Sequence, residues 1–358
     1  MSRDAGDAPG QTVDSGDPGM DTSPALRRRA LSISTFISLA FAVGFLVFLV
    51  FRFDLDLNEI GNRLRNADLK LFLLAILVHY TTFFFRGARW RVLLRNVRTG
   101  DERLLPAWHA GLVILVSWFA NSITFLRLGD AYRAIAYAED SGGSFSRTMG
   151  TVMSERLLDV AVVFLLLLGS AFMIYTLPGE HPSYLFLLLA LGLGLAGVLG
   201  LGMMLVFRDR LARMLPKSMA GVYERFHHGV TGSLKVRQLP AAMGWGALGW
   251  VSEFTRLYLV IQALGLDLAL PWVVFVTLAN ALLTLVPVTP GGLGVVEAGV
   301  AGVLALSMPV ADAAVVAVLD RIISYLSVVV FGGLAFFLRQ AWRSAQRRKA
   351  RQQPTVPV

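Results

Sequence analysis

The chain has 358 residues, of which 55% are apolar and only 16% are charged, and its mean hydropathy is +0.62. Because a soluble domain is about a quarter charged, this composition excludes an ordinary water-soluble fold and predicts a membrane protein, while the absence of cysteine excludes disulfides and thiolate metal sites. The net charge of +9 comes from basic residues that flank apolar segments, which indicates membrane orientation and contact with anionic lipid rather than binding of nucleic acid.

The apolar segments define three regions along the chain. Residues 1–25 are acidic and rich in Gly, Pro and Ser, and are expected to be a disordered tail. Residues 26–342 are expected to form one membrane domain, followed by a basic disordered tail at 343–358. Because roughly 20 apolar residues cross a bilayer as a helix, full spans are expected at about 30–51, 69–85, 157–177, 183–207, 240–263 and 312–338.

Two further apolar segments, 107–126 and 272–308, contain polar residues or helix breakers. Basic stretches flank the spans on one side and are expected to be cytoplasmic, whereas the connectors 178–183 and 264–271 contain no Lys or Arg and are expected outside. Both flanks of 107–126 then lie inside and both flanks of 272–308 lie outside. Each segment is therefore expected to enter the membrane and return on the same side.

The sequence thus predicts an all-α polytopic membrane protein with about six full spans and two re-entrant broken helices in an inverted repeat. Both termini are expected in the cytoplasm, and the location is expected to be the plasma membrane. Two matches support the duplication. Asn121 and Asn280 each lie midway through a re-entrant segment, and the pair Glu155–Arg156 corresponds to Asp320–Arg321.

Several charged residues fall inside predicted spans. Glu155 and Asp159 are four residues apart and share a helix face, while Glu253 and Arg256 are three apart and can pair directly. A central charge costs about 2.5–3.5 kcal/mol on insertion scales, so such residues usually face the bundle interior and mark a path or a relay. The alternative is a buried lattice of ion pairs that holds the bundle together.

The segment 280–299 contains the strongest helix-breaking pattern, with Pro290, Gly291, Gly292 and Gly294 in apolar sequence. A helix that restarts near Leu293 is expected to direct free N–H groups at a cavity, which favours an anionic ligand. Glu297 would lie in its first turn. The alternative is a structural kink in which Glu297 neutralises its own helix end.

Residues 125–133 leave the first re-entrant segment at the cytoplasmic face. Arg127 and Arg133 could bind a phosphate there, with Asp130 fixing one of them, because a guanidinium matches that geometry. Ordinary anchoring at the interface is the alternative, and it is the preferred interpretation for the basic residues and the tryptophan at 86–91. The five histidines are scattered, so neither a metal site nor a cofactor is predicted.

Five motifs in order resemble the flippase-like membrane domain of lysylphosphatidylglycerol synthases, which also occurs alone. They are Arg86-Gly-Ala-Arg-Trp-Arg-Val-Leu-Leu94, Arg127-Leu-Gly-Asp-Ala-Tyr-Arg133, Ser154-Glu-Arg-Leu-Leu-Asp159, Glu253-Phe-Thr-Arg256 and Pro290-Gly-Gly-Leu-Gly-Val-Val-Glu297. The resemblance implies a membrane part that moves a lipid between leaflets, and in full-length relatives a separate domain that transfers lysine. The chain leaves no room for that domain, so synthase activity is not expected. The family usually has a proline soon after the matching asparagine, where this chain has Ile123-Thr124-Phe125.

These observations predict a flippase-like transporter of an anionic or polyprenyl-phosphate lipid. The arginines expected to contact phosphate are Arg127, Arg133, Arg156, Arg256 and Arg321. The carboxylates expected to balance them or relay protons are Glu155, Asp159, Glu253, Glu297 and Asp320. Nothing in the sequence indicates ATP hydrolysis. An enzyme or enzyme partner in lipid-linked glycan or envelope assembly is the first alternative, and a small-solute transporter is the second.

Overall fold

The computed structural model describes Asn62 and residues 65–124, 128–177, 191, 192, 195, 220–285 and 290–352. Every regular element within those residues is a helix, which confirms the predicted all-α class for this part of the chain. The expected span at 30–51, the acidic tail and Arg127 lie outside the described residues, and so does the span expected at 183–207 apart from residues 191, 192 and 195.

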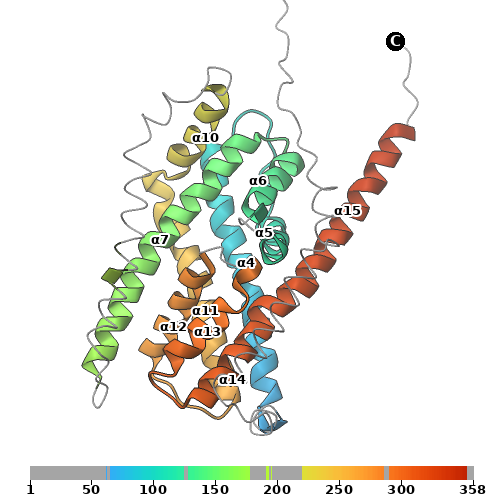
Figure 1. The fold of residues 1–358 in the computed structure, drawn as a ribbon. Coiled ribbons are helices and arrows are strands. Elements are labelled where there is room, and N and C mark those ends of the chain that lie inside the picture. Colours follow the sequence, from blue (N-terminus) through green and yellow to red (C-terminus); the bar gives the residue numbers. More distant parts are fainter. Residues whose placement is uncertain are drawn as a thin grey trace, which may run out of the picture.

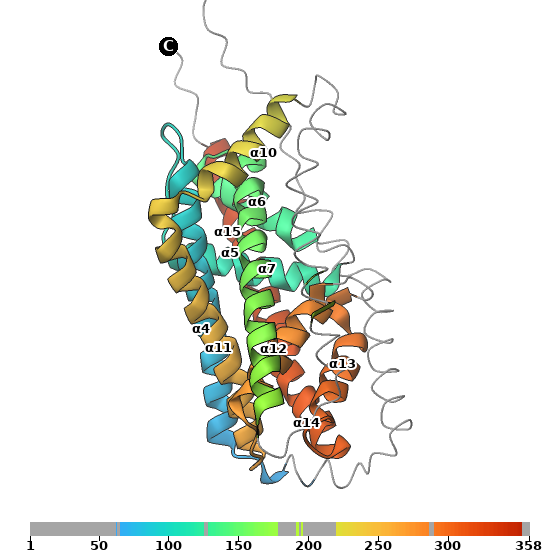
Figure 2. The ribbon, with the colours of Figure 1, turned by 90° about the vertical axis from the view of Figure 1, so that its left-hand side faces the viewer.

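Two long helices, α4 (Leu69–Val97) and α11 (Leu239–Ala263), pack side by side along most of their length (Figures 1 and 2). They are antiparallel, because the N–H of Asp68 before α4 donates to the carbonyl of Ala263 at the end of α11, at 2.7 Å. α11 matches the span expected at 240–263. α4 continues well past residue 85, where its span was expected to end, and this extension places the following arginines inside the bundle.

Helix α7 (Phe145–Thr176) begins at the end of the molecule where α4 finishes and packs there against α10 (Ala220–Ser233). Glycines allow this close approach, since a Cβ on Gly150 would overlap the backbone of α10 and a Cβ on Gly229 would overlap that of α7. The stretch between the spans expected at 183–207 and 240–263 therefore contains a packed helix. Its last residue accepts a hydrogen bond from Asn96 of α4 at 2.6 Å.

Helices α5 (Ala107–Ile123) and α6 (Leu128–Ser141) form a helical hairpin. The two open ends of the hairpin meet, because the N–H of Arg103 before α5 donates to the carbonyl of Ser141 at 2.9 Å. The segment expected to enter and return by itself, 107–126, is instead a single helix over residues 107–123, and the returning arm is α6, which lies beyond that segment. Residues 125–127 lie outside the described part of the chain.

A second hairpin consists of α12 (Leu270–Leu285), the short 3-10 turn η4 (Pro290–Gly292) and α13 (Val295–Leu304). Residues 268 and 303, near its two open ends, pack against the same apolar cluster. The predicted break in this segment is confirmed. The three glycines of the break have φ values of +64°, +71° and +85°, a backbone region that residues with a Cβ rarely adopt.

The last helical stretch combines α14 (Val310–Arg321), a π-helical turn (Ile322–Ser327) and α15 (Val328–Gln352). A π-helical turn inside a longer helix often marks a functional site. α15 packs against α5 and reaches into the region 343–358, whose first residues are helical here instead of the expected disordered tail (Figure 1).

Three helical stretches among the described residues are long and apolar enough to cross a membrane, namely Leu69–Val97, Phe145–Thr176 and Val310–Gln346. All three carry large apolar side chains on their outer surface; Leu77, Leu165 and Leu334 are 64%, 68% and 55% exposed. A surface of this kind is stable in lipid and not in water. The protein is therefore a polytopic helical membrane protein.

Candidate functional site

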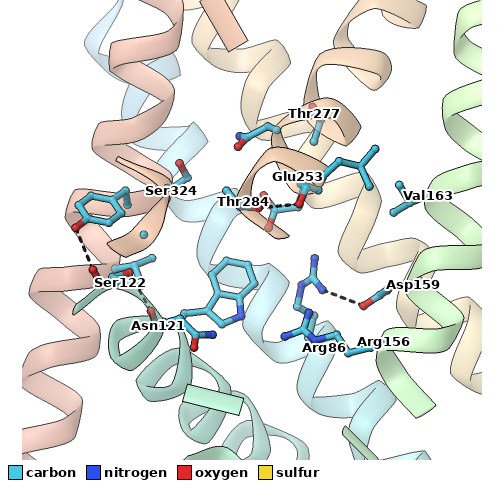
Figure 3. Close-up of a pocket in the computed structure, with 18 of the residues that line it drawn as sticks. Arg86, Asn121, Ser122, Arg156, Asp159, Val163, Glu253, Thr277, Thr284 and Ser324 are labelled. Carbon is cyan, nitrogen blue, oxygen red and sulfur yellow. Dashed lines mark hydrogen bonds and ion pairs between the residues drawn. The ribbon is translucent and has the colours of Figure 1, made fainter. Parts of the chain in front are cut away.

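A cavity of about 470 Å³ lies between the two hairpins and the long helices (Figure 3). Residues from α4, α5, α6, α7, α11, α12, η4 and the π-helical turn line it. The structure brings ten of the predicted site residues to its wall, namely Asn121, Asp130, Arg156, Asp159, Glu253, Arg256, Asn280, Gly291, Gly292 and Arg321. Glu155, Glu297 and Asp320 are buried beside these residues and bind arginines, as described below.

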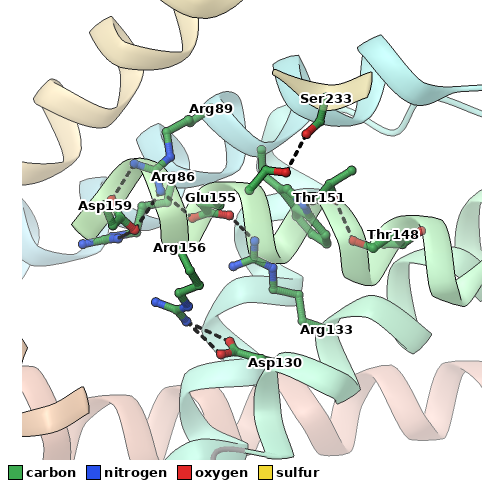
Figure 4. Close-up of polar contacts among 12 residues, drawn as sticks. Arg86, Arg89, Asp130, Arg133, Thr148, Thr151, Glu155, Arg156, Asp159 and Ser233 are labelled. Carbon is green, nitrogen blue, oxygen red and sulfur yellow. Dashed lines mark hydrogen bonds and ion pairs between the residues drawn. The ribbon is translucent and has the colours of Figure 1, made fainter. Parts of the chain in front are cut away.

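The first polar cluster joins α4, α6 and α7 (Figure 4). Arg89 of α4 donates to both carboxylate oxygens of Asp159, at 2.7 and 2.8 Å, and its guanidinium lies 3.0 Å from Glu155. Glu155 also accepts a hydrogen bond from Arg133 of α6. Glu155 and Asp159 thus share a helix face, as their spacing predicts, and together they bind one arginine.

Arg156, which follows Glu155 on α7, binds Asp130 in the first turn of α6 at 2.8 Å. Asp130 was expected to fix Arg127 or Arg133 as a phosphate-binding pair. Arg133 is instead 2% exposed and binds Glu155, and its guanidinium carbon lies 4.1 Å from the Trp90 ring centre. Arg133 therefore holds α6 against α4 and α7.

The second polar cluster joins α11, α12 and α14. Arg256 of α11 contacts Glu253 at 3.1 Å, the pairing that their spacing predicts, and donates to Asp320 at 2.6 Å. Asn280 of α12 lies with its amide nitrogen 3.4 Å from the second oxygen of Asp320. One arginine therefore neutralises two carboxylates in this cluster.

Arg321, which follows Asp320, binds the second hairpin at two points. Its Nε donates to Glu297 at 2.7 Å and its Nη2 donates to the carbonyl of Gly291 at 2.7 Å. The other oxygen of Glu297 accepts the N–H of Gly294 at 2.6 Å. Glu297 was expected either to line a path or to neutralise its own helix end. In the structure it binds the N–H at its own helix end, and it also holds Arg321 in place.

The extension of α4 adds site residues that were expected to be basic anchors at the interface. Arg86 and Arg89 are only 9% and 3% exposed, and Arg86 lines the cavity. Trp118 and Trp250 also line the cavity, and the rings of both contact the Arg86 guanidinium. The signal in the sequence was the spacing of three between the two arginines, which places both on one face of a helix.

Asp140, at the end of α6 and outside the three stretches that could cross a membrane, is the centre of a separate cluster. Asp140 accepts hydrogen bonds from His109 at 3.0 Å, from Arg339 at 2.8 Å and from Arg343 at 3.0 Å. Burial alone would raise the pKa of Asp140, but the hydrogen bonds from His109 and Arg339 outweigh it and hold the pKa below its usual value. This cluster ties the first hairpin to α15.

The described residues contain no group of three or more His, Asp or Glu side chains placed to hold a metal ion. The chemistry that this cavity offers is therefore that of guanidinium, carboxylate, amide and hydroxyl groups beside apolar side chains.

Comparison with known proteins agrees with this architecture. The family model described as "Lysylphosphatidylglycerol synthase TM region" matches residues 35–332. A UPF0104 membrane protein of Methanocaldococcus jannaschii is 31% identical over 62% of this chain and 94% of its own length. UPF0104 membrane proteins of Methanothermobacter thermautotrophicus and Pyrococcus horikoshii are each 24% identical, over 82% and 75% of this chain and 91% and 87% of their own. The chain therefore belongs to the family of the lysylphosphatidylglycerol synthase membrane region.

Proposed function

We propose that the chain is a transporter that moves an anionic or polyprenyl-phosphate lipid between the two leaflets of the plasma membrane. The cavity between the two hairpins carries this proposal. It combines arginines with apolar residues such as Met153, Val163 and Val328, as a lipid head group joined to acyl chains requires. A small polar solute would need no such apolar wall.

The proposal includes an inverted repeat. The order α4, first hairpin, α7 recurs as α11, second hairpin, α14–α15, and α4 and α11 run in opposite directions. The ion pairs recur as well: Arg156 binds an acidic residue in the first turn of α6, and Arg321 binds one in the first turn of α13. Two related halves in opposite orientation suit a site reached alternately from each side.

The proposed topology follows from the same arrangement. The basic end of α4, α10 and the end of α15 lie at one end of the molecule (Figure 1), which we assign to the cytoplasm. The first hairpin then enters from the cytoplasm and the second from outside, and neither crosses fully. Irregular backbone at the hairpin turns is tolerated in a membrane because protein and a polar cavity surround it.

An enzyme of lipid-linked glycan assembly is supported less well by the site. General acid–base chemistry requires a carboxylate that can reach a substrate and exchange a proton. The three carboxylates that line the cavity, Asp130, Asp159 and Glu253, each lie within about 3 Å of an arginine nitrogen. Carboxylates paired in this way are better suited to holding the lining of the cavity in place than to donating protons.

The test is lipid movement by the purified protein in sealed vesicles, with a fluorescent phosphatidylglycerol whose outer-leaflet fraction is bleached by a membrane-impermeant reductant. Vesicles with the protein should lose more than the outer-leaflet half of the fluorescence, and protein-free vesicles should lose only that half. Equal bleaching in both would refute transport of this lipid.

A cavity-filling variant makes the test specific to the site. Ser324 lines the cavity, so Ser324→Phe should stop movement while the protein remains folded. Val330 is on the same continuous helix but is 57% exposed, so Val330→Phe should leave movement unchanged. Movement that survives Ser324→Phe would place the lipid path elsewhere.

A further inference from the structure

Arg86 is a buried cation with an unusual environment. It lines the cavity from α4, and its guanidinium carbon lies 5.3 Å from the Trp118 ring centre and 5.4 Å from the Trp250 ring centre. Cation–π contact with two indole rings stabilises a positive charge and restricts the guanidinium without using its hydrogen-bond donors. The side chain is held in place while its N–H groups remain available.

Arg86 makes no hydrogen bond to a carboxylate in the described part of the chain. Its nearest ionic contact is Asp159, with the two charged atoms 3.9 Å apart, which is longer than a hydrogen bond. Both oxygens of Asp159 already accept from Arg89. The Nε of Arg86 is buried and has no hydrogen-bond partner among the described residues.

The other arginines of the cavity differ from Arg86 in that each of them donates a hydrogen bond to a carboxylate. Arg156, Arg256 and Arg321 each donate to a carboxylate oxygen, at 2.8, 2.6 and 2.7 Å. The charge of each of these arginines is already balanced by its carboxylate partner, so an anion that binds there would compete with that carboxylate. An anion at Arg86 would displace nothing and would fill donors that are otherwise unsatisfied.

We propose that Arg86, in contact with the rings of Trp118 and Trp250, is the residue that binds the phosphate group of the transported lipid. This inference rests on the proposed function and adds the site of head-group recognition to it. Two N–H groups of a guanidinium match two oxygens of a phosphate monoester or diester, and the phosphate is the anion that membrane lipids carry at their head group. The paired arginines around it form the wall of the site.

The inference is tested by binding to the purified protein in a maltoside detergent, which contains no phosphate. Isothermal titration with dioctanoyl phosphatidylglycerol, dioctanoylglycerol and inorganic phosphate separates the lipid head group, the acyl chains and the free anion. The wild type should bind the phosphatidylglycerol about tenfold more tightly than dioctanoylglycerol, because only the former engages the free donors. Inorganic phosphate that binds equally tightly and competes would assign the site to a free anion.

Arg86→Lys keeps the charge but loses the planar arrangement of donors, so its affinity for the phosphatidylglycerol should fall by about tenfold. Arg91→Lys is the matched control on the same helix, because Arg91 donates to the carbonyl of Leu105 and does not line the cavity. Its affinity should stay within about twofold of the wild type. Arg86→Met provides a second variant if the lysine variant does not fold, because methionine keeps a flexible apolar side chain beside Trp118 and Trp250, and Asp159 keeps its two hydrogen bonds from Arg89.

Wild-type affinity in Arg86→Lys or Arg86→Met would overturn the inference, and so would a wild type that prefers dioctanoylglycerol. Because binding in detergent requires no movement across a bilayer, the two proposals fail separately. Binding that depends on Arg86 in a protein that moves no lipid would refute only the transport function. Transport with unchanged binding in both variants would refute only the role of Arg86.

Discussion

Replacing Arg89 with methionine should destabilise the protein more than any change of an exposed arginine. Arg89 is 3% exposed and binds both oxygens of Asp159, which is itself 8% exposed. Removing one partner of a buried pair costs about 3–5 kcal/mol because the other charge is left uncompensated. Glu155 keeps a second arginine, Arg133, so the loss comes mainly from Asp159 and should lie near the lower end of that range.

The measurement is the free energy of unfolding in mixed detergent micelles, with Arg91→Met as the matched control. Arg91 is only partly buried and makes one hydrogen bond to a backbone carbonyl, so its loss should cost about 1 kcal/mol or less. The double variant Arg89→Met with Asp159→Asn removes both charges and should recover a large part of the loss. A double-mutant cycle then gives the interaction energy of the pair directly.

The same variants also probe the cavity. With Arg89 gone, Asp159 is free to draw in Arg86, whose charged group lies 3.9 Å away. Phosphatidylglycerol binding should therefore fall in the single variant and return in the double variant. The reasoning would be wrong if Arg89→Met cost no more than Arg91→Met, or if the double variant were no more stable than the single one.

Three further predictions follow from the geometry. Arg156 makes both of its hydrogen bonds to one carboxylate through a single nitrogen, whereas Arg321 uses two nitrogens for two acceptors. The melting temperature should therefore stay the same in Arg156→Lys and fall in Arg321→Lys. Because the pKa of Asp140 is lowered in the folded state, its contribution to stability is present above its unfolded pKa of about 3.9 and is lost as the pH falls through the folded pKa. Asp140→Asn should flatten the decline of unfolding free energy in acid; an identical pH profile would contradict this. An impermeant thiol reagent should label a cysteine at Asp267 from outside and one at Asp101 only after the membrane is opened, and the reverse pattern would invert the topology.

The sequence predicted the positions of the helix breaks because backbone chemistry is local. A proline followed by three glycines within five residues is too dense in helix breakers for a helix to continue, and the glycines at 291, 292 and 294 do adopt positive φ. Ion pairs within one helix could be predicted equally well, since Glu253 and Arg256 contact each other at their spacing of three. These features depend on a few neighbouring residues and on no tertiary contact.

Ion pairs between different helices could not be predicted from the sequence in the same way. Asp130 was expected to act on an arginine close to it in sequence, but it binds Arg156 on the next helix. Arg86 and Arg89 were expected at the interface because basic residues after an apolar run usually mark its end. α4 instead continues to Val97, and glycines of α11 lie beside the stems of both arginines. Only the packed partner helix distinguishes a buried arginine from an interfacial one.

Tyr325 shows how the two hairpins are coupled. Its hydroxyl donates to the carbonyl of Ser122 at the end of α5, at 3.3 Å, and its ring occupies the space that a Cβ on Gly291 would need. The residue sits in the π-helical turn, one turn after Arg321, which binds the second hairpin. Any rigid movement of one hairpin away from this turn must break a contact with Tyr325 or Arg321. Since both residues line the cavity, opening it toward either side of the membrane changes the wall that faces the bound head group.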